Sequence, residues 1–450
     1  MQTDNLIINR IMSSLASSVD LETKHLNNGK FEVEIVYLSS MIEHTQINKN
    51  VSLPFLVSDS FENFEHAITS CGAEKVADFS QIASFLLQGY VVIGYFSDIY
   101  CLSVKRALNN DPEETKTENT VIGPSKAFAE DLFTNLALIR FRYKKRELTV
   151  EPYEVGTSSK TKILLAFDAS LAKPSMIELV RDKLKAIDVD MLQASGQLEK
   201  LLNDTNYSLF PTVLITERPD RAVLNLSHGK AVLLIEGAAF VIVLPAVFFD
   251  FMSAMDDLYQ SFWITRSLVF LRYVSLVITV LLPAIYVSIV SYNPELFRVQ
   301  LTLSISGSRS AVPYPSYVEV FIMLFMIEAL TEASLRLPKF IGSTATTVGG
   351  LILGQAAQQA GLVSSIMIII TSAVAISNYV IPINSMSFAM RFVKYVLIAF
   401  ASFFGIIGTS VGFFLLISYL ASLRSFDEPY LKLFIGEKNV SYPESEGDST

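Results

Sequence analysis

The chain has 450 residues, of which 51% are hydrophobic and 18% are charged, and its formal net charge is −9. This composition is too apolar for an ordinary soluble protein and too polar for a chain that lies entirely within a membrane. The two cysteines, Cys71 and Cys101, exclude a disulfide framework. The N-terminal stretch lacks a basic start followed by an apolar block, so we expect no signal peptide and a front part in the cytoplasm.

The charge is unevenly distributed along the sequence. Between Arg266 and Arg424 there are nine basic and four acidic residues, so this region is mildly basic while the front part is acidic. Basic residues that bracket apolar runs are typical of contact with anionic lipid headgroups. The basic residues are scattered rather than clustered, so the sequence does not predict a nucleic-acid surface.

The front part contains two similar halves. The segments "FEVEIVYLSS" at 31–40 and "TKILLAFDAS" at 161–170 each combine a β-prone run with a following helical pattern. Later in each half, residues 88–104 and 228–244 place a glycine before two β-prone runs that are separated by a turn. We therefore predict a duplicated small α/β unit, with the first copy in residues 1–120 and the second in 121–262. Residues 127–143 should form a linker helix with Phe128, Leu132, Leu136 and Ile139 on one side.

The apolar stretch at 231–244 could be either a first membrane span or a soluble hairpin. Its counterpart in the first half is far too polar for a membrane. A carboxylate such as Glu236 at the centre of a span would cost about 2.5–3.5 kcal/mol. We therefore predict two strands, 231–235 and 240–244, joined by a turn at Glu236 and Gly237.

Residues 263–424 are expected to form an all-α polytopic membrane domain with four or five membrane segments. Trp263 suits an interfacial position, and the spans are expected at 267–290, 317–335, 365–381 and 393–423. Residues 343–363 either span or are re-entrant, and Gln355, Gln358 and Gln359 there need protein or water partners. The polar stretch at 293–315 should lie at the interface, and 425–450 should be a disordered polar tail.

Three carboxylates within the expected span at 317–335 are the strongest candidates for a functional site. Ionisable groups at membrane depth usually face a cavity, a partner or a conduction path, so Glu319, Glu328 and Glu332 are candidates for an ion path. The alternative is structural, with Glu332 paired to Arg336 and Glu319 at the interface. The sequence contains no catalytic motif, and none of its four histidines has metal-ligand spacing, so we expect no enzyme activity, no metal and no cofactor.

The segment "TERPDR" at 216–221 mixes charges around a proline. On physical grounds it is interpreted as a surface turn before a helix, with Asp220 in the first helical turn.

Several motifs together resemble one known family. "EDLFTNLALIR" (130–140), "SKT" (159–161), "TERPDR", "LPKFIG" (337–342), "GQAAQQAGLVS" (354–364) and "RSFDEPY" (424–430) occur in the order found in A subunits of GerA-type spore germinant receptors. The family-motif residues, with expected structural or coupling roles, are Asn135, Arg140, Glu217, Arg218, Pro219, Asp220, Arg221, Gln355 and Arg424. After Tyr430 the sequence departs from the family pattern.

The resemblance implies a two-part cytoplasmic α/β region followed by a multi-pass domain in the spore inner membrane. It implies a transporter-like B subunit and a lipoprotein C subunit as partners. It also implies a homo-oligomeric, ligand-gated channel component that passes monovalent cations in spore germination. The alternative is a non-conducting scaffold that docks the sensor subunit and downstream germination proteins.

Overall fold

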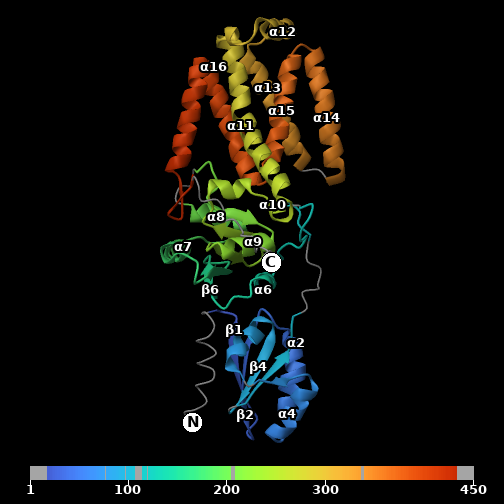
Figure 1. Ribbon diagram of the computed structural model, residues 1–450, viewed down its shortest axis with the longest axis vertical. Helices are drawn as coiled ribbons and strands as arrows, with labels where there is room; N and C mark the ends of the chain where they lie inside the picture. Colours follow the sequence, from blue (N-terminus) through green and yellow to red (C-terminus); the bar gives the residue numbers. More distant parts are fainter. Residues whose placement is uncertain are drawn as a thin grey trace, which may run out of the picture.

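The computed structural model describes residues 18–432 except 77, 97, 107–113, 119, 204–207 and 336–338. Two α/β units and a helical bundle follow one another along the long axis of the molecule (Figure 1). Both units contain antiparallel sheets, and the C-terminal region is helical with apolar helices. The fold class expected from the sequence is confirmed.

The first unit is a five-stranded sheet covered on both faces. Its strands are β1 (Leu21–Asn27), β2 (Glu32–Leu38), β3 (Glu74–Lys75), β4 (Tyr90–Tyr95) and β5 (Asp98–Ser103), in the order β1-β2-β4-β5-β3. Its helices are α2 (His44–Ile47), α3 (Leu53–Val57), α4 (Phe61–Ser70) and α5 (Ile82–Leu87). Residues of β2 and β4 alternate between the two faces, as strand geometry requires: Ile35 and Ile93 pack towards α2–α4, whereas Val36 and Val92 pack towards α5.

The second unit repeats this strand order. Its strands are β6 (Leu148–Val155), β7 (Thr161–Asp168), β8 (Leu214–Thr216), β9 (Ala231–Ile235) and β10 (Val241–Leu244), in the order β6-β7-β9-β10-β8. Its helices are α6 (Leu132–Arg142), α7 (Pro174–Ala186), α8 (Ser195–Leu202) and α9 (Pro219–Ser227). The predicted duplication is confirmed, and so is the hairpin at 231–244, because β9 and β10 pair as antiparallel strands.

The linker helix begins later than the sequence indicates. Helix α6 starts at Leu132 rather than at 127, because the carboxylate of Asp131 caps it by accepting a hydrogen bond from the Thr134 amide at 2.7 Å. Phe128, which was expected inside the helix, lies before it, and its amide donates to the Glu217 carbonyl.

Long helices form the C-terminal bundle. The short helix α10 (Asp256–Tyr259) leads from the second unit to the bundle. The bundle itself consists of α11 (Phe262–Tyr292), α12 (Val299–Arg309), α13 (Ser316–Leu335), α14 (Lys339–Gln359), α15 (Ser365–Val380) and α16 (Asn384–Ser422). Helix α16 is interrupted at Gly405, which adopts φ 60° and ψ −139°, and its two halves fold back side by side (Figure 1). In the described part of the chain, α11, α13, α14, α15 and the two halves of α16 are six helical segments of the bundle.

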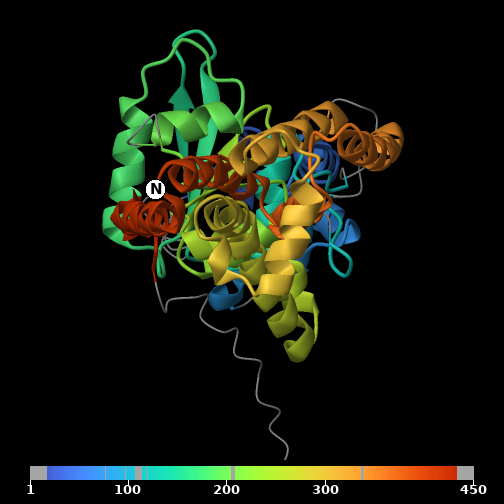
Figure 2. The ribbon, with the colours of Figure 1, turned by 90° about the horizontal axis from the view of Figure 1, so that it is seen from above.

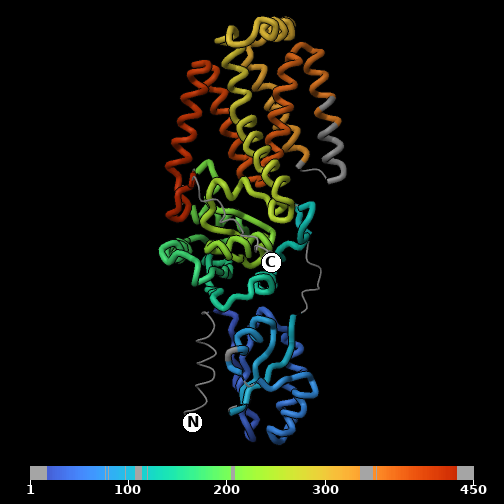
Figure 3. Tube along the Cα trace, in the orientation of Figure 1, coloured from blue at the N-terminus to red at the C-terminus, as the bar shows by residue number. Residues whose placement is uncertain are grey.

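The helices of the bundle differ in length, hydropathy and position. Helices α11 and α16 are long and apolar enough to cross a membrane. Helix α12 lies across the end of the bundle that is far from the α/β units (Figure 3). Seen along the long axis, the red helices of α16 and the orange helices of the α14 region lie on opposite sides of α11 (Figure 2).

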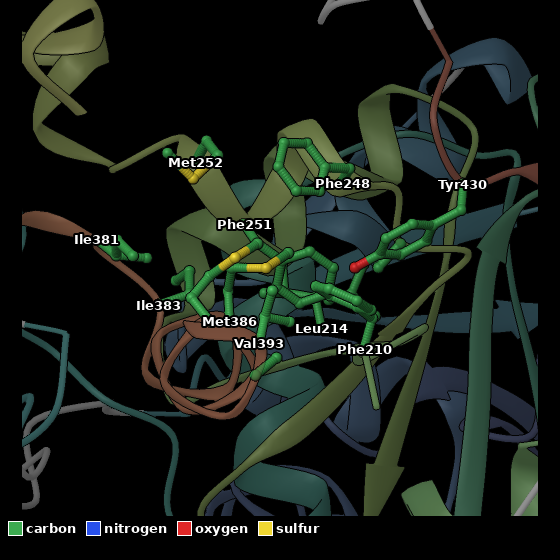
Figure 4. Close-up of a cluster of buried hydrophobic side chains, with 14 of the residues drawn as sticks. Phe210, Leu214, Phe248, Phe251, Met252, Ile381, Ile383, Met386, Val393 and Tyr430 are labelled. Atoms are coloured by element: carbon green, nitrogen blue, oxygen red, sulfur yellow. The ribbon is translucent and has the colours of Figure 1, made fainter. Parts of the chain in front are cut away.

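The chain returns from the bundle to the second unit, which the sequence did not predict. Strands β11 (Arg424–Ser425) and β12 (Glu428–Pro429) form a hairpin there, and the Ser425 hydroxyl donates to the Thr212 carbonyl at 2.6 Å. Tyr430 is fully buried beside Phe210, Phe248 and Phe251, in a cluster that continues to Ile383 and Met386 of the bundle (Figure 4). The expected disordered tail is therefore corrected for 425–432, while 433–450 lie outside the described residues.

Candidate functional site: a buried charged junction

The segment at 216–221 is buried, although the sequence indicated a surface turn. It leads from β8 into α9, and Pro219 occupies the first turn of that helix, as expected. The side chains of Glu217, Arg218, Asp220 and Arg221 are between 0% and 9% exposed. The expected surface position is wrong because two distant chain segments fold over these charges and satisfy them.

The guanidinium of Arg218 forms hydrogen bonds through all three of its nitrogen atoms. Its Nε and Nη2 donate to the two carboxylate oxygens of Asp220 at 3.1 and 2.7 Å. Its Nη1 donates to the Glu118 carbonyl and to the Thr120 hydroxyl, and Nη2 also donates to the Pro124 carbonyl at 2.9 Å. All five N–H groups of the guanidinium are thus used, which is the condition for burying such a charge at tolerable cost.

Glu217 and Arg221 connect the same region to two further segments. Glu217 Oε1 accepts the amides of Thr117 and Glu118 at 2.6 and 3.0 Å. Arg221 Nη1 donates to Glu118 Oε2 at 2.9 Å, and its Nη2 donates to the carbonyls of Asp250 and Ser253. We call Glu118, Glu217, Arg218, Asp220 and Arg221 the junction network. They join the linker between the two units, at 117–124, to residues 250–259, which lead from the second unit to α11 and which we call the approach to the bundle.

The approach to the bundle is bound by two further contacts. The Tyr259 hydroxyl donates to Asp220 Oδ2 at 3.1 Å, and burial together with the Asp220 charge raises the pKa of Tyr259. Arg272 of α11 forms a bidentate pair with Asp257, with Nη2 donating to Oδ1 at 2.9 Å. The second α/β unit is therefore connected by charged contacts to the first helix of the bundle.

A second buried pair joins the two α/β units. Arg140 Nε and Nη2 donate to the two oxygens of Asp20, both at 2.7 Å, and both side chains are at most 2% exposed. Burial acts to raise the pKa of Asp20, but the Arg140 charge and the hydrogen bonds from Arg140, Ser18 and Ser40 outweigh it and hold the pKa below its usual value. Arg140 thus positions the first unit on the second.

This pair predicts a specific response to acid. A carboxyl whose pKa is depressed in the folded state adds stability above its unfolded pKa of about 3.9, and that stability is lost as the pH falls through the folded pKa. We expect Asp20→Asn to lower the melting temperature at pH 7 and to flatten its fall below about pH 4. Thermal unfolding followed by circular dichroism tests this, with the exposed Asp188→Asn as control. Parallel curves for wild type and Asp20→Asn would contradict the assignment.

The other family-motif residues have separate positions. Asn135 is fully buried and holds the turn before α6, because its side-chain amide accepts the Ala129 amide at 2.7 Å and donates to the Ala129 carbonyl at 2.6 Å. Arg424 is exposed and pairs with Asp427 at 3.1 Å. Gln355 is exposed on α14. The structure therefore does not bring these three residues into the junction network.

The candidate carboxylates of α13 point to different partners. Glu319 is fully buried, accepts the Ser364 amide at 2.6 Å and lies 3.3 Å from Arg309 Nε. Glu328 lies between Lys394 Nζ at 2.8 Å and Arg391 Nη1 at 3.1 Å, both from α16. Both carboxylates are thus paired within the chain.

Glu332 stands apart from the other two carboxylates. It is exposed, and its expected partner Arg336 lies outside the described residues. Sequence reasoning missed the partners of Glu328, although the three-residue spacing of Arg391 and Lys394 places both on one helix face. It also missed Asp20, because nothing in the sequence around Asp20 indicates a partner 120 residues away.

Helix α14 is the outer helix of the bundle (Figure 1). Gly349 and Gly350 allow it to approach Leu330 of α13, since an added Cβ would lie 3.3 and 3.4 Å from that side chain. On its other side Ile352, Gln355 and Gln359 are exposed. Gln355 and Gln359 are thus uncovered in the single chain, whereas Gln358 donates to the Ser365 hydroxyl at 3.0 Å.

Comparisons with known proteins agree on one family. The family model described as "Bacillus/Clostridium GerA spore germination protein" matches residues 9–441. The chain is 34% identical over 407 residues to the uncharacterized membrane protein YfkQ of Bacillus subtilis (strain 168), covering 88% of this chain and 79% of that protein. It is 32% identical over 436 residues to spore germination protein A1 of the same organism, covering 95% and 89%.

One solved structure is also similar. It is the crystal structure of the N-terminal domain of the A subunit of the Bacillus megaterium spore germinant receptor GerK3. The match covers 54% of this chain and 93% of that chain, with 23% sequence identity and a TM-score of 0.39.

Proposed function

Since the chain belongs to the GerA family of spore germination proteins, we propose that it is the A subunit of a nutrient germinant receptor. In this proposal it acts in the spore inner membrane, together with a transporter-like B subunit that senses the germinant and a lipoprotein C subunit. Its role is to respond to germinant binding on a partner, and it carries out no catalysis. The family match over residues 9–441 is the observation that carries this assignment.

The arrangement of the bundle supports a membrane location with both α/β units on one side, which we propose is the cytoplasmic side. Helices α11 and α16 have the length and hydropathy of membrane spans. An even number of passes returns the chain to the side from which it entered, in agreement with the contact between Ser425 and Thr212 of the second unit. Helix α12 then lies at the opposite interface, where exposed Val299 and Leu303 can contact lipid.

We further propose that copies of the chain assemble around a polar path for monovalent cations, and that α14 lines this path. The exposed Gln355 and Gln359 of α14 support this step, because an amide that faces hydrocarbon without a hydrogen-bond partner is costly. The sequence had favoured α13. However, Glu319 and Glu328 are engaged within the chain, and two bases on Glu328 leave a net positive charge that repels cations.

A pair of substitutions tests which helix lines the path. Gln355→Leu removes a polar group from the proposed wall, and we expect it to slow germinant-triggered potassium release about tenfold, as about 1.4 kcal/mol added to a barrier does. Glu332→Gln, at an exposed position on α13, should leave the rate unchanged. Potassium release from germinating spores is the measurement, with receptor abundance checked by immunoblot. A normal rate with Gln355→Leu and a slowed one with Glu332→Gln would return the wall to α13.

The second candidate function is a non-conducting scaffold that docks the sensor subunit. The same ion pairs favour the scaffold, because they pair two of the three α13 carboxylates with bases of the same chain. The two functions differ in stoichiometry: a channel needs several A subunits in one complex, whereas a scaffold can form a one-to-one complex with the sensor.

A further inference from the structure

The loop at 120–126, which leads from the linker into α6, exposes two adjacent aliphatic side chains. Val121 is 85% exposed and Ile122 is 57% exposed. We call the part of this loop that carries both side chains, residues 120–124, the linker loop. Two such side chains are a small surface by themselves, so their meaning depends on the larger apolar surface that they adjoin.

The junction network holds the base of the linker loop in one place. Arg218 donates to the Thr120 hydroxyl at 3.1 Å and to the Pro124 carbonyl at 2.9 Å, on either side of the aliphatic pair. Because Arg218 is itself fully buried and bound to Asp220, the loop is tied to the rigid start of α9.

The tip of the linker loop is held by the approach to the bundle. The Val121 amide donates to Asp256 Oδ1 at 3.0 Å. Gly123 lies so close to Tyr259 that an added Cβ would be 2.8 Å from its ring, and its φ of +154° also suits glycine. Both contacts are to α10, so the exposed aliphatic pair lies beside the start of α11.

The start of α11 carries the same kind of surface. Phe262 is 58% exposed and Trp263 is 79% exposed, while the Arg266 guanidinium lies 5.2 Å from the Phe262 ring centre. Aromatic residues with nearby arginines are typical of a membrane–water interface. The linker loop reaches this level of the molecule, next to α10 and below the bundle (Figure 1).

We infer that the linker loop inserts Val121 and Ile122 into the cytoplasmic interface of the bilayer beside Trp263, and that the junction network holds it there. The occupant is lipid, because the surface continues along α11 to the exposed Phe270 and Leu271. The linker between the α/β units is thereby anchored to the membrane surface. This inference rests on the proposed membrane location.

Trp263 is the only tryptophan, so single-tryptophan variants can locate each position. The full chain carrying Trp263→Phe would be reconstituted in phosphatidylethanolamine–phosphatidylglycerol vesicles, with or without brominated acyl chains, which quench tryptophan on contact. We expect Val121→Trp in this background to lose fluorescence in the brominated vesicles. Val277→Trp on the lipid side of α11 is the positive control, and Val57→Trp on the first unit is the aqueous control.

The outcomes distinguish the insertion of the linker loop from the membrane location of the bundle. Quenching at 277 without quenching at 121 would overturn the insertion of the loop while leaving the membrane location intact, and would indicate water or protein around the loop. An absence of quenching at 277 would overturn the membrane location itself. In the Val121→Trp chain, Asp256→Ala should reduce the quenching, whereas Asp188→Ala should not; equal quenching in both would show that the contact with α10 does not hold the loop.

Discussion

Replacing Arg218 with alanine is expected to lower the free energy of unfolding of the second α/β unit by about 3–5 kcal/mol, the cost of breaking a buried ion pair from one side. The substitution leaves the Asp220 carboxylate buried without its partner, and it also frees the carbonyls of Glu118 and Pro124. The loss should appear in denaturant unfolding of the full chain in detergent, as early loss of the second unit.

A matched arginine provides the control for this prediction. Arg424 also belongs to a family motif, but it is 69% exposed and pairs with an equally exposed Asp427. Exposed ion pairs of this kind contribute about 0–1 kcal/mol, so Arg424→Ala should change the unfolding free energy little. Equal effects of the two substitutions would show that the burial of Arg218 is not what makes it important.

Removing the Tyr430 side chain is expected to have an effect of similar size. Tyr430 fills a cluster with Phe210, Phe248 and Phe251, and alanine there leaves a large cavity, which costs about 3–5 kcal/mol for a buried aromatic residue. Because this cluster holds the end of α16 against the second unit, Tyr430→Ala should also release the β11–β12 hairpin. Faster proteolysis near residue 424 would report that release.

The hydroxyl of Tyr430 makes a sharper comparison possible. Among the described residues it has no hydrogen-bond partner, and burial raises its pKa well above the usual value. An unpartnered buried hydroxyl is a cost rather than a contribution, so Tyr430→Phe should be neutral or stabilising. Tyr430→Phe as damaging as Tyr430→Ala would mean that the hydroxyl, and not the ring, holds the hairpin.

Patterns within a short stretch predicted the fold well. The hairpin at 231–244 was identified because the first half of the chain contains its polar counterpart, and because Glu236 does not suit a membrane. The outer strands β1, β3, β6 and β8 were missed. Strands β3 and β8 have only two and three residues, which is too short for an alternating pattern to be recognised.

Features that depend on distant partners could not be predicted in the same way. The burial of Arg218 requires Glu118 and Pro124, which lie about one hundred residues earlier in the chain. Likewise, the apolar run at 393–423 looks like one long span, and only the backbone of Gly405 reveals the reversal within it. A continuous apolar sequence contains no signal for a turn of this kind beyond the glycine itself.

The stoichiometry of the receptor shows directly whether copies of this chain surround a polar path. The full chain would be purified with its partner subunits in detergent, and the protein mass of the complex measured by light scattering with correction for bound detergent. We expect a complex that contains several copies of the 450-residue chain. A stable complex with one copy of this chain and one copy of the sensor subunit would contradict it.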